Sequence, residues 1–480
     1  MSAGPTPRST AAGPGESSVL RDVISPVTGT VLGSVRLAGP LEIQRLLRER
    51  AGDTAPLDRR EVLDFLHRLK EQLLAHQREL IRTTIFETGF ITADSREIVT
   101  AAIEFLADFE TYAEDQAGPP TRVPHSYAGK SSREMLITHR PYRWIAAVVP
   151  QNASLTLGIT IIASALYAGS RVLLRPSLQC GCTGALLAEL VERSEPPGSS
   201  VLIVNCLATD FLDACYTAEQ VDVIHYIGSN QFALPVLMDA YAARKLCLLD
   251  GQGNGMLYLD ETFPIEHAVD IVTCGATRFN GETCTSVNGV LIQQEIYEPV
   301  RDALVDVFGA LRVGDPTFPE TEIGPMFSRE QAAGLARALR AGSHMRLLCG
   351  GSAEGAYLAP AIVEGVARDD LLVRQGLFGP ALWIQPVRDG ELFDWLRANQ
   401  FPLGDAILST RPELVRAFAA QSRAARICVN EDPSVESMFE PWGGYPPSGL
   451  NPVSIWIDKY RQAFQLDGRL GLDRADGAAA

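Results

Sequence analysis

The sequence has little lysine and no excess of positive charge. Of its 42 basic residues only four are lysine, and the 480-residue chain carries a net charge of −16 with a pI near 5.0. Polyanions such as nucleic acids and anionic lipid surfaces attract basic proteins and repel an acidic one. The composition therefore argues against nucleic acid or a membrane surface as the main partner.

The chain also lacks a recognisable targeting or membrane-spanning segment. Residues 1–18 are rich in Gly, Pro, Ser, Thr and Ala and contain no apolar run of the kind found in a signal peptide, so we expect a disordered tail. The apolar stretch 155–174 is interrupted by Thr, Ser, Gly and Arg171 and is not expected to cross a membrane.

Paired cysteines are missing as well. The nine cysteines are scattered without a CxxC motif, and Cys180 and Cys182 lie too close together for a zinc knuckle. We therefore expect reduced thiols, a cytosolic protein and no metal centre.

The length and the pattern of apolar residues predict an α/β protein. A chain of this size exceeds one hydrophobic core, so two or three domains are expected. Alternating strands and helices indicate parallel βαβ units with helices on both sheet faces, in two α/β domains joined near residue 248. The expected elements are a hairpin over 25–35, helices within 41–116, strands at 134–138, 144–149, 171–175, 201–204, 221–227, 256–259, 289–293, 381–384 and 427–429, and helices at 155–168, 182–193, 265–278 and 295–309.

Cys284 has the most distinctive surroundings of any cysteine in the chain. Its neighbours over 278–286 are mostly small and polar, and Gly281 lies three residues before it. Glycine allows close approach of backbone to a ligand, and a thiol near free backbone N–H groups can be held as a thiolate. A reactive thiol is one interpretation, but these neighbours alone favour an inert buried cysteine, and the motifs elsewhere in the chain decide between the two.

Short motifs in a characteristic order resemble the aldehyde dehydrogenase superfamily from about Ser25 to Phe464. The matching pieces are Ser25-Pro26-x-Thr28-Gly29, Pro150-Gln151-Asn152, Leu174-Arg175-Pro176-Ser177, Ile227-Gly228-Ser229, the Cys284 stretch, Gly314-Asp315-Pro316, Ile323-Gly324-Pro325, Leu377-Phe378-Gly379-Pro380 and Pro441-Trp442-Gly443-Gly444-Tyr445-x-x-Ser448-Gly449. The resemblance implies a subunit with a Rossmann-like cofactor domain, an α/β catalytic domain and a small β arm for oligomerisation.

The resemblance also implies domain boundaries and an assembly. The NAD(P)-binding domain would comprise 19–125 and 146–248, and the catalytic domain 249–440. The arm would combine 126–145 with 455–470, and a homodimer or homotetramer is expected.

The implied chemistry is oxidation of an aldehyde through Cys284. A thiolate attacks the carbonyl, and the thiohemiacetal passes a hydride to nicotinamide and becomes an acyl-enzyme. Asn152 stands at the position of the family's oxyanion asparagine and would donate its amide N–H together with the Cys284 backbone N–H. The alternative for Asn152 is a residue that caps the turn between a strand and a helix.

The same resemblance assigns the cofactor, NAD or NADP, to the ends of the first domain's strands. Gly228 and Ser229 end a strand and open a helix, where backbone N–H groups favour pyrophosphate. Val149 follows another strand, and Arg175 replaces the family's usual lysine. Phe378 matches the phenylalanine near the nicotinamide ribose, with a core aromatic as its alternative.

The group that would release the acyl product departs from the family pattern. The usual Glu-Leu-Gly-Gly-Lys is replaced by residues 248–254, Leu-Leu-Asp-Gly-Gln-Gly-Asn. Aligning on the downstream Asp260 puts Leu248 at the glutamate position, whereas counting back from Cys284 puts Asp250 there. Asp250 is the candidate general base, and a solvated or turn carboxylate is its alternative.

Further departures affect cofactor binding and suggest other functions. Gly376, Leu178 and Gln151 replace a ribose-binding glutamate, the glutamate of Lys-Pro-x-Glu and the tryptophan of Pro-Trp-Asn. The segments 253–261 and 280–284 look like the branch of the superfamily that releases the acyl group to CoA. Three hypotheses follow: an NAD(P)-dependent aldehyde dehydrogenase, a CoA-acylating enzyme, and a degenerate member with a structural or binding role.

Overall fold

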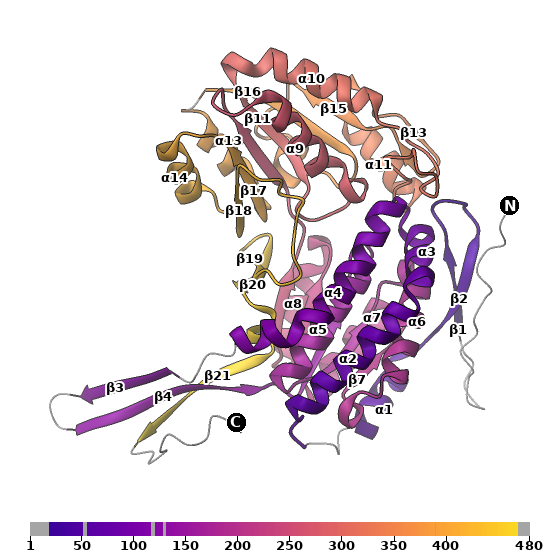
Figure 1. Cartoon of the computed structure of the whole chain (residues 1–480), viewed down its shortest axis with the longest axis vertical. Helices are drawn as coiled ribbons and strands as arrows, with labels where there is room; N and C mark the ends of the chain where they lie inside the picture. Colours follow the sequence, from indigo (N-terminus) through magenta and orange to yellow (C-terminus); the bar gives the residue numbers. More distant parts are fainter. Residues whose placement is uncertain (1–18, 51–54, 117–120, 128–130, 389, 469–480) are drawn as a thin grey trace.

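The computed structural model describes residues 19–50, 55–116, 121–127, 131–388 and 390–468, and the expected tail 1–18 lies outside them. The chain forms two α/β lobes and a projecting β arm (Figure 1). Chain segments cross between the lobes near residue 250 and again near residue 440. None of the described helices is long and apolar enough to cross a membrane.

A seven-stranded sheet forms the centre of the first lobe, in the order β19-β20-β9-β8-β5-β6-β7. Its parallel part consists of β5 (Trp144–Val148), β6 (Arg171–Arg175), β7 (Val201–Ile203), β8 (Val221–Ile227) and β9 (Leu246–Asp250). The strand β20 (Gly449–Ser454) pairs antiparallel with β9, and β19 (Trp442–Gly444) pairs antiparallel with β20. The expected boundary at residue 248 therefore falls inside β9, and residues 442–454 join the first lobe's sheet.

Helices cover both faces of this sheet, as the alternating pattern predicts. One core cluster includes residues of α2 (Arg59–Ala75), α3 (Gln77–Thr88), α4 (Thr92–Gln116), α5 (Ser154–Ala168), α6 (Gly181–Arg193) and α15 (Trp456–Lys459). The other includes residues of α1 (Pro40–Arg50), α7 (Ala208–Thr217) and α8 (Asn230–Ala242). The strands between them are almost continuously apolar because both of their faces are buried.

The second lobe is built on another seven-stranded sheet, in the order β12-β15-β16-β11-β10-β17-β18. Its strands are β10 (Gly255–Leu259), β11 (Val287–Gln293), β12 (Arg346–Cys349), β15 (Ala361–Glu364), β16 (Ala381–Val387), β17 (Gly404–Leu408) and β18 (Arg426–Val429). All pairs are parallel except β12 with β15. One core packs against α9 (Ile265–Thr277) and α10 (Tyr297–Ala310), the other against α11 (Arg329–Ala338), α12 (Leu371–Gln375), α13 (Leu392–Ala398) and α14 (Pro412–Gln421).

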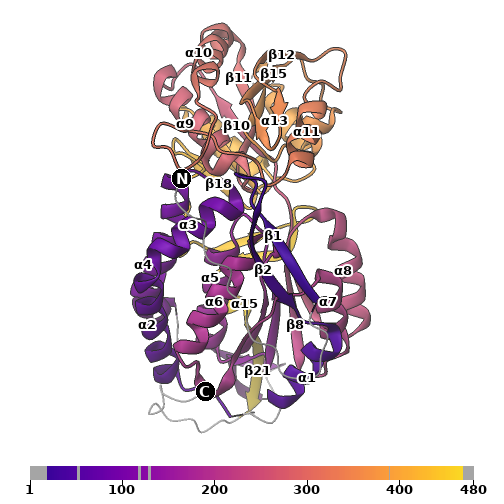
Figure 2. The same ribbon diagram turned by 90° about the vertical axis from the view of Figure 1, so that its right-hand side faces the viewer.

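The predicted N-terminal hairpin exists, but its strands are shifted. The strands are β1 (Val19–Ile24) and β2 (Val31–Leu37), so residues 25–30 form the turn rather than part of the first strand. The turn is closed by Ser25 N–H donating to the Thr30 carbonyl at 2.9 Å, and Gly29 has a φ of 69°. Figure 2 shows the hairpin running along the first lobe towards the second. Its core residues pack against α6.

The arm is a three-stranded antiparallel sheet in the order β21-β4-β3. Its strands are β3 (Thr121–Tyr127), β4 (Ser131–Pro141) and β21 (Arg461–Gly468). They extend away from both lobes (Figure 1). The arm thus begins at residue 121, somewhat before the expected 126.

Candidate active site

Predicted site residues from the first lobe meet where its parallel strands end. Val149 follows β5, Arg175 ends β6, Gly228 follows β8 and Asp250 ends β9. Because these strands are parallel neighbours, their carboxyl ends share one edge of the sheet, the usual position for ligands in such sheets. Cys284 comes just before β11 of the second lobe, so its turn faces the same junction from the other side.

A close backbone approach joins the two halves of the site. Asp250 ends β9 and Gly255 begins β10, so residues 251–254 form the link between the lobes. A Cβ atom on Gly253 would lie 1.9 Å from the Cys284 carbonyl oxygen. Only glycine fits there, and its presence lets the link that follows Asp250 pack directly against the Cys284 turn.

The backbone before Cys284 takes an unusual conformation that a side chain secures. Phe279, Asn280 and Gly281 have φ values of 52°, 55° and 65°. The Asn280 amide donates to the Pro325 carbonyl at 3.0 Å, and its oxygen accepts from the Gly324 N–H at 2.9 Å. Residues in such conformations persist only when surrounding contacts hold them, and they cluster at functional sites.

The surroundings of Cys284 do not favour the thiolate form that its polar neighbours in the sequence suggested. Burial, followed by the nearby carboxylates of Glu436 and Asp250, raises the pKa of the Cys284 thiol, while its own N–H lowers it. Both effects that raise the pKa act against the charged form. The side chain is still partly accessible. Cys284 is therefore a partly accessible thiol whose surroundings favour the protonated form.

Glu436 is a neighbour of Cys284 that the sequence did not reveal. Its side chain hydrogen-bonds with that of Thr285, and it lies 3.7 Å from the Arg426 guanidinium. Burial raises the pKa of Glu436, although 31% of its side chain remains exposed. It comes from a loop, and no periodic pattern or motif marks it in the sequence.

Asp250 is buried rather than solvated. Only 4% of the residue is exposed, and its Oδ2 accepts hydrogen bonds from His225 Nε2 at 2.7 Å and Asn451 Nδ2 at 2.8 Å. No described residue hydrogen-bonds to Oδ1, which is also buried. Leu248, the other candidate for this position, packs in the apolar core. A buried carboxylate oxygen without a partner can accept a proton or a hydrogen bond from a ligand.

Asn152 lies in the turn between β5 and α5. The N-cap residue of α5 is Ala153, and no side chain caps the helix. The Asn152 amide makes no hydrogen bond with any other residue that the structure describes. The capping alternative is therefore wrong, and the amide N–H is available as a donor.

The predicted cofactor residues differ in the groups that they can present to a ligand. Val149 is fully buried, so only its backbone can meet a ligand. Arg175 donates from Nε to the Cys206 carbonyl at 3.1 Å, and burial lowers the pKa of its guanidinium. The Gly228 N–H donates to the Asp250 carbonyl at 2.9 Å and is not directed at a phosphate, whereas Ser229 caps α8 by accepting from the Gln231 N–H at 3.2 Å.

A dinucleotide fits this edge through its phosphates better than through its ribose. The N-terminus of α8 and the Arg175 cation favour anionic groups. Gly376 has a φ of 77°, and a Cβ there would lie 2.6 Å from Asn288 Oδ1, so the packing leaves no room for the family's glutamate. Leu178 is buried and apolar. Groups that attract phosphate are therefore present, while the two ribose carboxylates of the family pattern are replaced by Gly376 and Leu178.

Phe378 lies half-buried beside a carboxyl group that sequence reasoning missed. Its carbonyl accepts from Gln331 Nε2 at 3.4 Å, and the same nitrogen donates to Glu282 Oε1 at 3.1 Å. Glu282 is fully buried, and this burial raises its pKa well above the usual value. A groove of about 1090 Å³ opens nearby between the β1–β2 hairpin and the second lobe, but none of the eight predicted site residues lines it.

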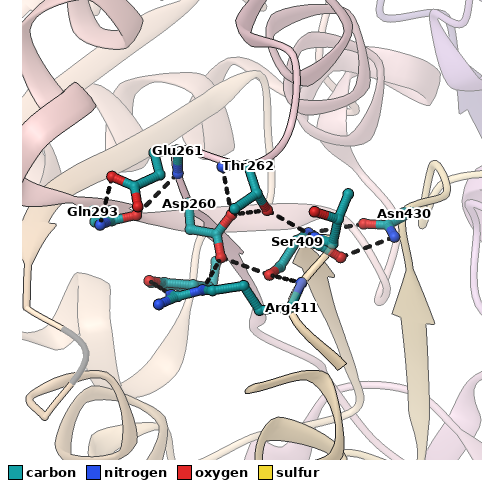
Figure 3. Close-up of polar contacts among 9 residues, drawn as sticks. Asp260, Glu261, Thr262, Gln293, Ser409, Arg411 and Asn430 are labelled. Carbon is teal, nitrogen blue, oxygen red and sulfur yellow. Dashed lines mark hydrogen bonds and ion pairs between the residues drawn. The ribbon is translucent and has the colours of Figure 1, made fainter. Parts of the chain in front are cut away.

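A separate polar cluster closes the far edge of the second lobe's sheet (Figure 3). Asp260 follows β10 and is fully buried; its carboxylate accepts from Thr262, from Ser409 Oγ at 2.5 Å and from Arg411 Nε at 2.8 Å. Gln293 and Asn430 extend the cluster. It lies at the carboxyl ends of the strands, opposite the edge that Cys284 occupies, so it is a stabilising network rather than part of the site.

The site thus combines two α/β lobes with a partly accessible thiol at their junction. The chain belongs to the aldehyde dehydrogenase family, because the sequence model of that family matches residues 14–464. The expected aldehyde dehydrogenase fold is thus confirmed, and the expected cofactor, NAD or NADP, agrees with the family.

Individual relatives and structures support the assignment. A putative aldehyde-dehydrogenase-like protein of Sinorhizobium fredii is 27% identical over 438 residues, covering 88% of this chain and 83% of the relative. Sulfoacetaldehyde dehydrogenase of Neptuniibacter caesariensis is 25% identical, and the match covers 81% of this chain and 85% of the relative. Among solved structures, an NAD-dependent aldehyde dehydrogenase from Sinorhizobium meliloti matches with a TM-score of 0.86, 24% identity and coverage of 95% and 92%. The NADP complex of glyceraldehyde-3-phosphate dehydrogenase from Methanocaldococcus jannaschii matches with a TM-score of 0.84 and 20% identity, covering 93% of this chain and 98% of that structure.

Proposed function

We propose that the protein is an NAD(P)-dependent aldehyde dehydrogenase that oxidises an aldehyde to an acid through Cys284. The observation that carries the proposal is the junction itself. The buried carboxylate of Asp250, with one free oxygen, acts electrostatically on the partly accessible Cys284 thiol, and the intervening link packs against the Cys284 turn. A nucleophile and a candidate base therefore share one site.

In the first step the Cys284 thiol gives its proton to solvent water, and the sulfur bonds to the carbonyl carbon. The carbonyl oxygen becomes an oxyanion, and the Asn152 amide and the Cys284 N–H donate to it. Loss of one such donor typically costs about 2.7–4 kcal/mol of transition-state stabilisation. Because the pKa of the thiol is raised, we expect the rate of this step to increase with pH.

In the second step the acyl group leaves Cys284. NAD(P), when bound, supplies the acceptor for the hydride, and a thioester remains on the sulfur. Asp250 Oδ1 takes a proton from water as the water oxygen attacks the thioester carbon, and the carbon–sulfur bond breaks to release the acid. A buried carboxylate in this position favours release by water over release to CoA, because a thiol nucleophile needs less help from a base.

A homodimer or homotetramer is the proposed assembly. Besides the arm, α8 supports it, because four of its large apolar residues are exposed: Phe232, Leu234, Met238 and Tyr241. Clustered exposed apolar surface is typical of protein interfaces. Light scattering after gel filtration measures the mass, and a monomer at micromolar concentration would contradict the proposal.

The activity test uses purified protein, a panel of aldehydes, NAD+ or NADP+, and assays with and without CoA, followed at 340 nm. We expect turnover that does not need CoA. Cys284→Ala should abolish it, whereas Cys274→Ala, the matched control at an exposed free cysteine, should not. Asp250→Asn should leave an acyl-enzyme visible by mass spectrometry.

The other outcomes select the other hypotheses. CoA-dependent turnover would show a CoA-acylating enzyme. No turnover, together with no binding of NAD+ or NADP+ in calorimetry, would show a degenerate member of the family.

A further inference from the structure

Behind Asp250 lie four buried polar side chains that the proposed chemistry does not yet use. Together with Asp250 they form a group that we call the Asp250 cluster. It brings together four elements, β8, β9, β20 and α15, and consists of His225, Asp250, Asn451, Lys459 and Tyr460. All five residues are at most 5% exposed. So many polar groups in a core are costly unless each has a partner.

The hydrogen bonds of His225 define its tautomer. Nε2 lies 2.7 Å from Asp250 Oδ2, and Nδ1 lies 2.9 Å from the Tyr460 hydroxyl. An ionised carboxylate can only accept, so Nε2 carries a proton and donates it. Burial keeps the pKa of the Tyr460 hydroxyl well above its usual value, so this hydroxyl stays protonated and donates to Nδ1. A neutral His225 thus satisfies both neighbours.

Asn451 and Lys459 support the same oxygen of Asp250 from the other side. Asn451 Nδ2 donates to Oδ2 at 2.8 Å, and its own oxygen accepts from Lys459 Nζ at 3.0 Å. Lys459 also donates to the Trp442 carbonyl at 2.6 Å. Burial lowers the pKa of Lys459 to about 8, so the amine is still mainly cationic at neutral pH. Oδ2 therefore accepts two hydrogen bonds, backed by a positive charge, while Oδ1 accepts none from the described residues.

We infer that His225 is a positioning residue for release of the acyl group. It holds Oδ2 of Asp250 by a hydrogen bond, which leaves Oδ1 for the water that attacks the Cys284 thioester. The inference rests on the proposed function, in which Asp250 is the base. The single glutamate of the family pattern would be replaced by an aspartate whose shorter side chain is oriented by a histidine.

The test separates formation of the acyl-enzyme from its release. A pre-steady-state burst of reduced cofactor measures formation, and the steady-state rate and mass spectrometry measure release. For His225→Leu we expect release to slow by about 10- to 100-fold at pH 7, the effect of losing a hydrogen bond to a charged group. The burst should change much less. His225→Gln, which can still present an N–H to Oδ2, should restore most of the rate.

Tyr460→Phe provides a second variant of nearly unchanged shape, useful if His225→Leu does not fold. It removes the donor to Nδ1, so we expect slower release with a burst that changes much less. A burst and a release that fall together, or a release rate that stays as in the wild type for both variants, would overturn the inference.

Asp250→Asn distinguishes this failure from failure of the proposed function. If Asp250→Asn releases product at the wild-type rate, Asp250 is not the base and the proposed function needs another one. If Asp250→Asn blocks release while the His225 and Tyr460 variants behave like the wild type, only the role of His225 is wrong.

Discussion

Restoring the family's ribose-binding glutamate at Gly376 should harm the protein rather than improve cofactor binding. Gly376 has a φ of 77° and a ψ of −179°, a conformation that is almost confined to glycine. A Cβ atom there would lie 2.6 Å from Asn288 Oδ1 and 2.9 Å from Asn254 Cβ. Both asparagines are buried and hydrogen-bonded, so neither can move aside freely.

The expected cost has two parts. A residue other than glycine in this backbone conformation costs about 1–3 kcal/mol. Forcing extra atoms into a packed core costs about 1–3 kcal/mol more. The total, about 2–6 kcal/mol, is a large part of the 5–15 kcal/mol of free energy of unfolding that is usual for a protein.

Urea unfolding and calorimetry check this prediction. Gly376→Glu and Gly376→Ala should both unfold at clearly lower urea than the wild type, and Gly376→Glu should not bind NAD+ or NADP+ more tightly. Gly355→Ala is the matched control, because Gly355 also has a positive φ, 62°, but nothing lies within 4 Å of a Cβ there. A Gly376→Glu protein that is as stable as the wild type and binds NAD+ more tightly would refute the reasoning.

Three further predictions concern the core and the site. In Gly253→Ala the new Cβ would lie 1.9 Å from the Cys284 carbonyl oxygen, so the turn that carries Cys284 should shift. We expect kcat to fall by about 100-fold or more while the circular dichroism spectrum is retained. An unchanged kcat would contradict the close approach. Burial raises the pKa of Asp405 from 3.8 to about 6. The free energy of unfolding of the wild type relative to Asp405→Asn should therefore be highest below about pH 4 and fall by about 3 kcal/mol as the pH rises through 6. Urea unfolding at pH 4 and pH 7 measures this difference, and a difference independent of pH would count against the assignment. Asp260→Ala removes the buried carboxylate that pairs with Arg411 and should lower the free energy of unfolding by about 3–5 kcal/mol. Its kcat should stay nearly unchanged, because the cluster lies at the edge opposite Cys284. Thr262→Ala removes one hydroxyl donor from the same carboxylate and should lower the free energy of unfolding by about 1 kcal/mol.

Much of the fold could be predicted because the pattern of apolar residues has a local physical cause. Strands buried on both faces read as short continuous apolar runs, and most of the expected elements lie within a few residues of their positions in the structure. The first strand of the hairpin was missed because Val19–Ile24 carries Arg21 and Asp22 and is mostly exposed, so it does not read as an apolar run. The boundary near 248 falls inside β9, because pairing with β8 and with the distant β20 places all of β9 in the first lobe.

The candidate site was predicted less completely. Cys284, Asn152 and Asp250 could be named because they stand at fixed distances along the chain from recognisable motifs. Their protonation and partners could not be named, because these depend on residues far away in the sequence. Glu436 lies more than a hundred residues after Cys284, yet its carboxylate raises the pKa of that thiol.

The sequence by itself determined the α/β class, the family and the thiol that we propose as the nucleophile, because these follow from periodicity and from short motifs in order. Only the tertiary structure decided what surrounds that thiol. Burial and two carboxylates raise its pKa, Gly376 has no space for a ribose-binding carboxylate, and His225 and Asn451 hold one oxygen of Asp250 and leave the other free. The physical reason is that desolvation and hydrogen bonding act through space, between atoms that the chain brings together only when it folds.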